Sequence, residues 1–71
     1  MTNVTAKLDY AKQQILMNME QFAPHITVAK KEQFADELTA LIDWTNPALM
    51  HKGFSWMTLR YLEKNRLVQY N

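Results

Sequence analysis

The apolar periodicity of the first 22 residues constrains the fold of this sequence more than any other feature. Apolar side chains recur there at spacings of four, three, four, four and three, at Val4, Leu8, Ala11, Ile15, Met19 and Phe22. This spacing places them on one face of an amphipathic helix. Thr2 or Asn3 can cap the first turn, and Pro24 disfavours the helical conformation at Ala23. We therefore predict a long helix over residues 3–22.

A second helix is predicted over residues 28–44. Its inner face is expected to consist of Phe34, Ala35, Leu38, Leu41 and Ile42. Thr27 is a suitable N-cap, but two lysines in the first turn oppose the helix dipole, so the beginning of this helix is poorly defined. An alternative is a short strand over residues 25–28, with the helix beginning near Glu32.

A short third helix is predicted over residues 47–52. Asn46 is a good N-cap, and Pro47 suits the first helical position because its missing N–H has no partner there. Gly53 suits the left-handed residue that follows a helix end.

A fourth helix is predicted to follow at once. Ser55 can cap it, Leu59 and Leu62 are expected to point inward, and Asn65 is the expected left-handed terminator. Residues 67–70 have the composition of a short strand.

These elements predict an all-α fold. The chain has 71 residues, too few for a second domain, and its content of 48% hydrophobic and 21% charged residues is that of a folded protein. We expect a small bundle of about four helices in a single domain over residues 1–71. Two short helices joined at a glycine also make residues 47–66 helix-turn-helix-like.

Several function classes are disfavoured by composition. The sequence has no cysteine, two histidines (His25 and His51), no glycine-rich phosphate loop and no Ser/His/Asp set, so we expect no enzyme, cofactor, metal or small-molecule substrate. The acidic residues of the second helix are interpreted as a solvated face or as an interface for a basic partner; they are Glu32, Asp36, Glu37 and Asp43. Without a signal peptide or a membrane span, a cytoplasmic location is expected.

Charge is distributed unevenly along the chain. Residues 1–46 carry four lysines and six acidic residues, a net charge of −2, whereas residues 47–71 carry four basic residues and one acidic residue, a net charge of +3. This asymmetry indicates that the C-terminal third faces an anionic partner or the acidic part of another copy.

Residues 53–68, which read Gly-Phe-Ser-Trp-Met-Thr-Leu-Arg-Tyr-Leu-Glu-Lys-Asn-Arg-Leu-Val, resemble the helix-turn-helix of MerR-type regulators and, more loosely, winged-helix proteins. The matching residues are Gly53, Ser55, Thr58, Leu59, Arg60, Tyr61, Glu63, Lys64 and Leu67. The resemblance implies that Ser55 and Thr58 begin a recognition helix and approach a phosphate. It also implies that Arg60, Tyr61 and Lys64 contact the DNA backbone or bases.

Two function hypotheses follow. The first is a small, non-enzymatic DNA-binding regulator or accessory factor, with contacts from Lys52, Ser55, Thr58, Arg60, Tyr61, Lys64 and Arg66. The alternative is a protein-binding modulator or inhibitor of the phage or mobile-element type. It would act through the acidic second helix or through a patch of Trp56, Met57 and Tyr61, because tryptophan and methionine are typical of protein-binding surfaces. The apolar stripe of the first helix also predicts a homodimer.

Overall fold

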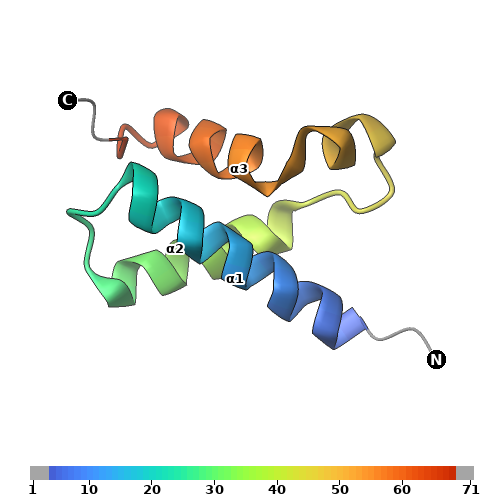
Figure 1. The fold of residues 1–71 in the computed structure, drawn as a ribbon, viewed down its shortest axis with the longest axis horizontal. Helices are drawn as coiled ribbons and strands as arrows, with labels where there is room; N and C mark the ends of the chain where they lie inside the picture. The colour runs from blue at the N-terminus through green and yellow to red at the C-terminus, as the bar shows by residue number, and fades with distance from the viewer. Residues whose placement is uncertain (1–3, 69–71) are drawn as a thin grey trace.

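The computed structural model describes residues 4–68, and within this range the protein consists of three helices and no strand (Figure 1). The helices are α1 (Val4–Phe22), α2 (Val28–Leu41) and α3 (Pro47–Lys64). Helix α1 packs against both other helices, whereas α2 and α3 contact each other only weakly. The predicted all-α class is confirmed. The prediction of about four helices is wrong, because α3 unites the last two across a kink.

One face of α1 forms the centre of the hydrophobic core. Ala11, Ile15 and Met19 are completely buried, as the periodicity predicts, and Leu8 and Phe22 are half-buried. The side chain of Val4 and the predicted caps Thr2 and Asn3 lie outside the described residues. Because the rest of the chain covers this stripe, the homodimer predicted to form through it would require the core to open.

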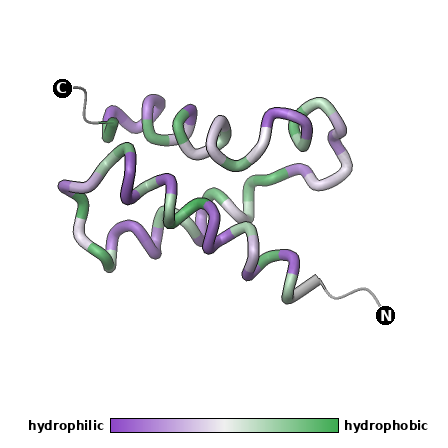
Figure 2. Tube along the Cα trace, viewed as in Figure 1, coloured by the Kyte–Doolittle hydropathy of each residue, from purple (hydrophilic) through white to green (hydrophobic). Residues whose placement is uncertain are grey.

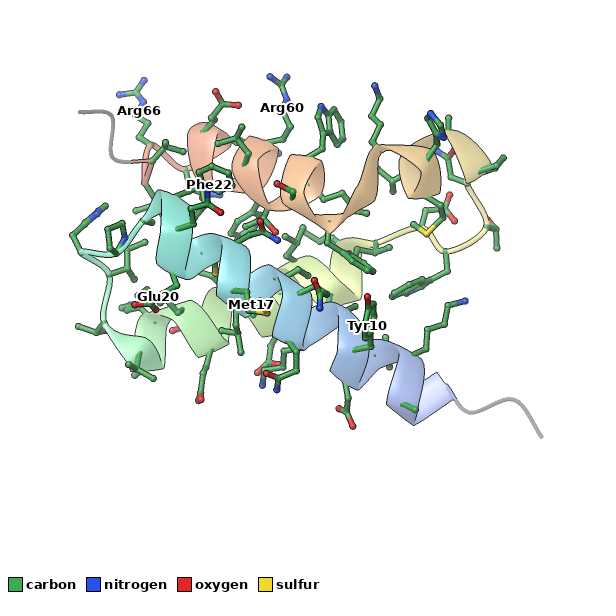
Figure 3. All side chains as sticks on the ribbon, viewed as in Figure 1. Tyr10, Met17, Glu20, Phe22, Arg60 and Arg66 are labelled. Carbon is green, nitrogen blue, oxygen red and sulfur yellow. The ribbon has the colours of Figure 1, made fainter. Side chains whose placement is uncertain are left out.

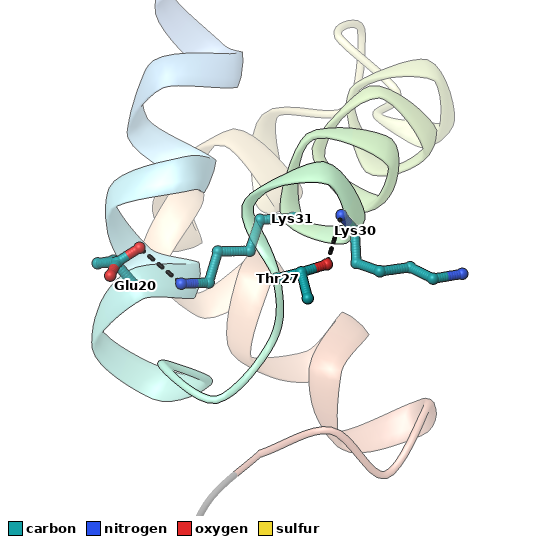
Figure 4. A network of polar contacts seen from close by, with 4 residues as sticks. All are labelled: Glu20, Thr27, Lys30 and Lys31. Atoms are coloured by element: carbon teal, nitrogen blue, oxygen red, sulfur yellow. Dashed lines mark hydrogen bonds and ion pairs between the residues drawn. The ribbon is translucent and has the colours of Figure 1, made fainter.

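Helix α2 begins at Val28 through a side-chain cap, so the alternative of a strand over residues 25–28 is wrong. The Oγ1 atom of Thr27 accepts a hydrogen bond from the backbone N–H of Lys30 at 3.3 Å (Figure 4). The neighbouring Lys31 is buried, and its Nζ atom donates to Oε2 of Glu20 at 2.6 Å. This ion pair offsets the unfavourable position of the Lys31 charge near the helix N-terminus and joins the beginning of α2 to the end of α1.

Helix α2 ends at Leu41, three residues before the predicted end at Trp44. Ile42 already has an extended backbone, with φ −69° and ψ 127°. The carboxylate of Asp43 then accepts hydrogen bonds from the Thr45 hydroxyl at 2.6 Å and from its backbone N–H at 3.0 Å, and these bonds lower the pKa of Asp43. Such local side-chain bonds compete with the helix and end it early.

The inner face of α2 also differs from the prediction in one position. Ala35, Leu38 and Ile42 are buried, but Leu41 is 70% exposed. Since α2 packs mainly against α1, a narrow stripe at four- and three-residue spacing is enough to fill the contact. Leu41 lies beside this stripe and stays in solvent.

Helix α3 begins as predicted. Asn46 caps it, with its Oδ1 atom accepting from the backbone N–H of Ala48 at 3.0 Å and of Leu49 at 3.3 Å, and Pro47 occupies the first helical position. The kink lies at Gly53 alone, with φ 84° and ψ 171°.

The predicted cap at Ser55 is wrong. Gly53 makes the whole change of direction, and Ser55 already has a helical backbone within α3. The turn between the two halves of α3 is therefore one residue, shorter than the three or four residues usual in a helix-turn-helix.

The C-terminus of α3 is closed by Arg66 and not by Asn65. Asn65 has φ −93°, whereas Arg66 has φ 58°. The N–H of Arg66 donates to the carbonyl of Glu63 at 3.0 Å, and the N–H of Leu67 donates to the carbonyl of Leu62 at 2.8 Å. This pair of bonds is a Schellman motif. It turns the next two residues back onto the core, so they form no strand; the rest of the predicted strand, residues 69–70, lies outside the described residues.

Hydrophobic and hydrophilic residues alternate along all three helices (Figure 2). In residues 4–68, no helix has both the length and the apolar character needed to cross a membrane.

Candidate nucleic-acid interface

The outward side of α3 carries a row of basic side chains with one aromatic ring among them. Lys52, Trp56, Arg60 and Lys64 recur at four-residue spacing, and all four are exposed. Side chains four residues apart lie on the same side of a helix, which accounts for Trp56, Arg60 and Lys64. Lys52 precedes the kink at Gly53, and its contact with the Trp56 ring places it on the same face. Figure 3 shows Arg60 pointing away from the other two helices, with Arg66 beyond the end of α3. We call Lys52, Trp56, Arg60 and Lys64 the basic face.

Trp56 lies between two cations on this face. The Nζ atom of Lys52 is 5.0 Å from the centroid of the Trp56 ring, and the Cζ atom of Arg60 is 5.9 Å from it. Both distances fall within the range of cation–π attraction. Trp56 is 39% exposed, so it belongs to the surface and not to the core. The four-residue spacing of lysine, tryptophan and arginine is the sequence signal that would have predicted this cluster.

The charge balance of α3 favours an anionic partner. Glu63 is the one acidic residue in the helix, and its Oε1 atom lies 3.6 Å from a guanidinium nitrogen of Arg60. Together with Lys64 these two residues line a shallow depression. An exposed pair at this distance is weak, so a phosphate can compete for Arg60.

Two of the four lysines of α1 and α2 are held in ion pairs, so they contribute less to a phosphate-binding surface. Lys12 lies 2.9 Å from a carboxylate oxygen of Asp36, and Lys31 is paired with Glu20. The exposed residues of α2 include three acids, at Glu32, Asp36 and Glu37. The predicted charge asymmetry is thus a difference in net charge between helices, which is 0 for α1, −1 for α2 and +2 for α3.

Two of the predicted site residues are directed into the core. Thr58 is fully buried and Met57 is 5% exposed. The resemblance implies that Thr58 approaches a phosphate, but its burial prevents this. Met57 likewise cannot form part of an exposed protein-binding patch. The reason is the orientation of α3: Met57, Thr58 and Leu62 form its buried side, and this places Trp56 and Arg60 outside.

The other predicted residues divide between the surface and an inter-helix contact. Ser55 and Arg66 are exposed beside the basic face. Tyr61 is half-buried; its ring lies 6.1 Å from that of Phe34, and its hydroxyl donates to Oε2 of Glu37 at 2.9 Å. Tyr61 therefore joins α3 to α2 in the free protein and is not part of the basic face.

Replacing Thr58 by valine is expected to stabilise the protein by about 1 kcal/mol. The Oγ1 atom of Thr58 is buried without a hydrogen-bond partner in the described part of the chain, and an orphaned hydroxyl costs about 1–3 kcal/mol. Thr39→Val is the matched control, because the Thr39 hydroxyl donates to the carbonyl of Ala35 at 2.6 Å. Urea denaturation should show a higher midpoint for Thr58→Val than for the wild type, and no such increase for Thr39→Val. A lower midpoint for Thr58→Val would contradict the burial of an unpaired hydroxyl.

The contact between Tyr61 and Glu37 predicts a loss of stability at high pH. Burial, together with the hydrogen bond to Glu37 and the charge of that carboxylate, raises the pKa of Tyr61 to about 12. Because the pKa is near 10 in the unfolded chain, the stabilisation is complete below pH 10 and is lost as the pH rises towards 12. Thermal denaturation between these pH values should show a smaller loss for Tyr61→Phe than for the wild type. Equal losses would mean that Tyr61 titrates normally.

Within the range that the structure covers, no group of three or more His, Cys, Asp or Glu side chains is placed to hold a metal ion. No protein-family model, curated protein or solved structure matches the chain.

Proposed function

We propose that this protein is a small, non-enzymatic DNA-binding regulator or accessory factor that contacts the phosphate backbone through the basic face of α3. The observation that carries the proposal is the exposure of Lys52, Arg60 and Lys64 along one side of a single helix. Lysine and arginine side chains on one helix face are the usual donors to DNA phosphates.

The rest of the site fits this role. Ser55 and Arg66 are exposed next to the basic face, so they can add a hydrogen bond and a further charge to the contact. Four cations neutralise about four phosphates, which predicts binding of modest affinity that depends strongly on salt. The acidic residues of α2 would be repelled by DNA, and this favours an orientation in which α3 faces the nucleic acid.

Charge-removing variants test this proposal. Arg60→Ala and Lys64→Ala should each weaken binding to a labelled DNA and reduce the slope of log affinity against log salt by about 1, because each removes one phosphate contact. Lys30→Ala is the matched control: Lys30 is an exposed lysine on α2, and its loss should leave the slope unchanged. Equal effects from all three variants would contradict the proposal. So would the absence of binding to both duplex and single-stranded DNA at protein concentrations on the order of 10⁻⁴ M.

A protein-binding modulator is the second candidate, and the exposure of Trp56 favours it. Tryptophan and arginine are enriched among the residues that dominate protein interfaces, and Trp56 lies beside Arg60. Met57 is buried and Tyr61 is bonded to Glu37, so the protein-binding patch is reduced to Trp56, Arg60 and their neighbours. This candidate predicts binding to a partner protein that persists at high salt and is abolished by Trp56→Ala.

A further inference from the structure

Trp56 differs in its surroundings from the other large aromatic residues. Tyr10 and Trp44 each lie edge-on to Phe54, with ring centroids 6.1 and 6.2 Å apart. Trp44 also has one cation over its ring, the Nζ atom of Lys7 at 4.8 Å. The exposed ring of Trp56 instead lies between two cations, one from the preceding turn and one from the following turn of the same face. It is therefore an aromatic ring at the centre of the surface that carries the positive charge.

Such a ring is poorly suited to reading a DNA duplex. A duplex presents the edges of its bases in the grooves, and these are read by hydrogen bonds. An indole offers one N–H donor and a large apolar surface. In a single strand the faces of the bases are accessible, and an aromatic side chain can stack on any of them.

The two cations can leave the ring when a nucleic acid binds. Cation–π contacts between exposed groups are weak, whereas a phosphate offers Lys52 and Arg60 a full opposite charge. Moving from ring to phosphate, the cations would uncover the indole beside the strand that they hold. A basic surface with an aromatic ring at its centre has the composition of sites that bind single strands.

We infer that the basic face binds single-stranded DNA in preference to duplex, with Trp56 stacked on an unpaired base and with Lys52 and Arg60 on the flanking phosphates. This inference rests on the proposed DNA binding and names the form of DNA that the site takes. It requires no sequence preference, because every base has a face on which an indole can stack.

The test compares one labelled oligonucleotide of about 15 nucleotides with the duplex of the same sequence. Anisotropy titrations at low salt should show tighter binding of the single strand. Trp56→Ala should weaken single-strand binding on the order of tenfold and change duplex binding by less than about twofold. Trp56→Phe, which keeps a ring for stacking, should retain most of the affinity. Arg60→Ala should weaken the binding of both forms.

Fluorescence provides a second readout. In a Trp44→Phe background, Trp56 is the one tryptophan left in the sequence, and its emission should be quenched by the single strand. Circular dichroism of each variant checks that the helices are retained. Duplex binding as tight as single-strand binding, or single-strand binding unaffected by Trp56→Ala, would overturn the inference and leave DNA binding standing. Failure of both forms to bind would overturn the proposed function as well.

Discussion

Replacing Ile15 by alanine is expected to lower the free energy of unfolding by about 2–5 kcal/mol. Ile15 is completely buried in the middle of α1, the helix that packs against both others, and it belongs to the hydrophobic core cluster. Alanine at this position would leave a cavity that α2 and α3 can fill only by moving towards α1. A domain of 71 residues has a total stability of about 4–10 kcal/mol, so this single change removes a large part of it.

Urea denaturation followed by circular dichroism measures this effect. Met17→Ala is the matched control, because Met17 lies two residues further along α1 and is 65% exposed. The control should change the free energy of unfolding by less than about 0.5 kcal/mol. Equal losses for the two variants would contradict the placement of α1 as the central helix.

Replacing Gly53 by alanine is expected to destabilise the protein by about 1–3 kcal/mol. Gly53 has φ 84° and ψ 171°, a region of backbone conformation that is almost restricted to glycine. A Cβ atom at this position would meet no other atom within 4 Å, so the cost arises from the backbone and not from a steric clash. If the helix straightened to relieve the strain, the segment from Pro47 to Lys52 would change direction, and the position of Lys52 relative to the Trp56 ring would change with it.

Two measurements check this prediction. Thermal denaturation gives the loss of stability, and the emission of Trp56 in the Trp44→Phe background reports whether Lys52 still lies near the ring. Ser55→Ala is the control, since Ser55 is exposed and helical in the same helix. Unchanged stability and unchanged emission for Gly53→Ala would mean that the kink does not position the basic face.

The helices could be predicted from the sequence where one signal dominates. The apolar period of α1 and the proline that follows it lead to predicted bounds within one residue of Val4–Phe22. The end of α2 could not be predicted in this way, because the hydrogen bonds between Asp43 and Thr45 are local and compete with a helical pattern that continues to Trp44. The sequence predicts that Gly53 ends a helix, whereas its backbone bends a helix that continues.

The site could be predicted only in part because the sequence of α3 allows two inward faces. One places Leu59 and Leu62 inside, as predicted from the sequence, and the other places Met57, Thr58 and Leu62 inside and leaves Leu59 half-buried. Packing against α1 selects the second, and this buries Thr58 and exposes Trp56. The basic residues of this helix are exposed, as their predicted contact with an anionic partner requires. Their relation to the indole depends on the rotation of α3, which the pattern of this short segment does not determine.

The salt dependence of DNA binding tests the central claim, a phosphate-binding basic face on α3, most directly. Anisotropy of a labelled oligonucleotide should be titrated with the wild-type protein at about 50 and 200 mM salt. If Lys52, Arg60, Lys64 and Arg66 each neutralise one phosphate, the affinity should fall by about a hundredfold between the two conditions. Affinity that is equal at both salt concentrations, or no binding at either one, would contradict the claim.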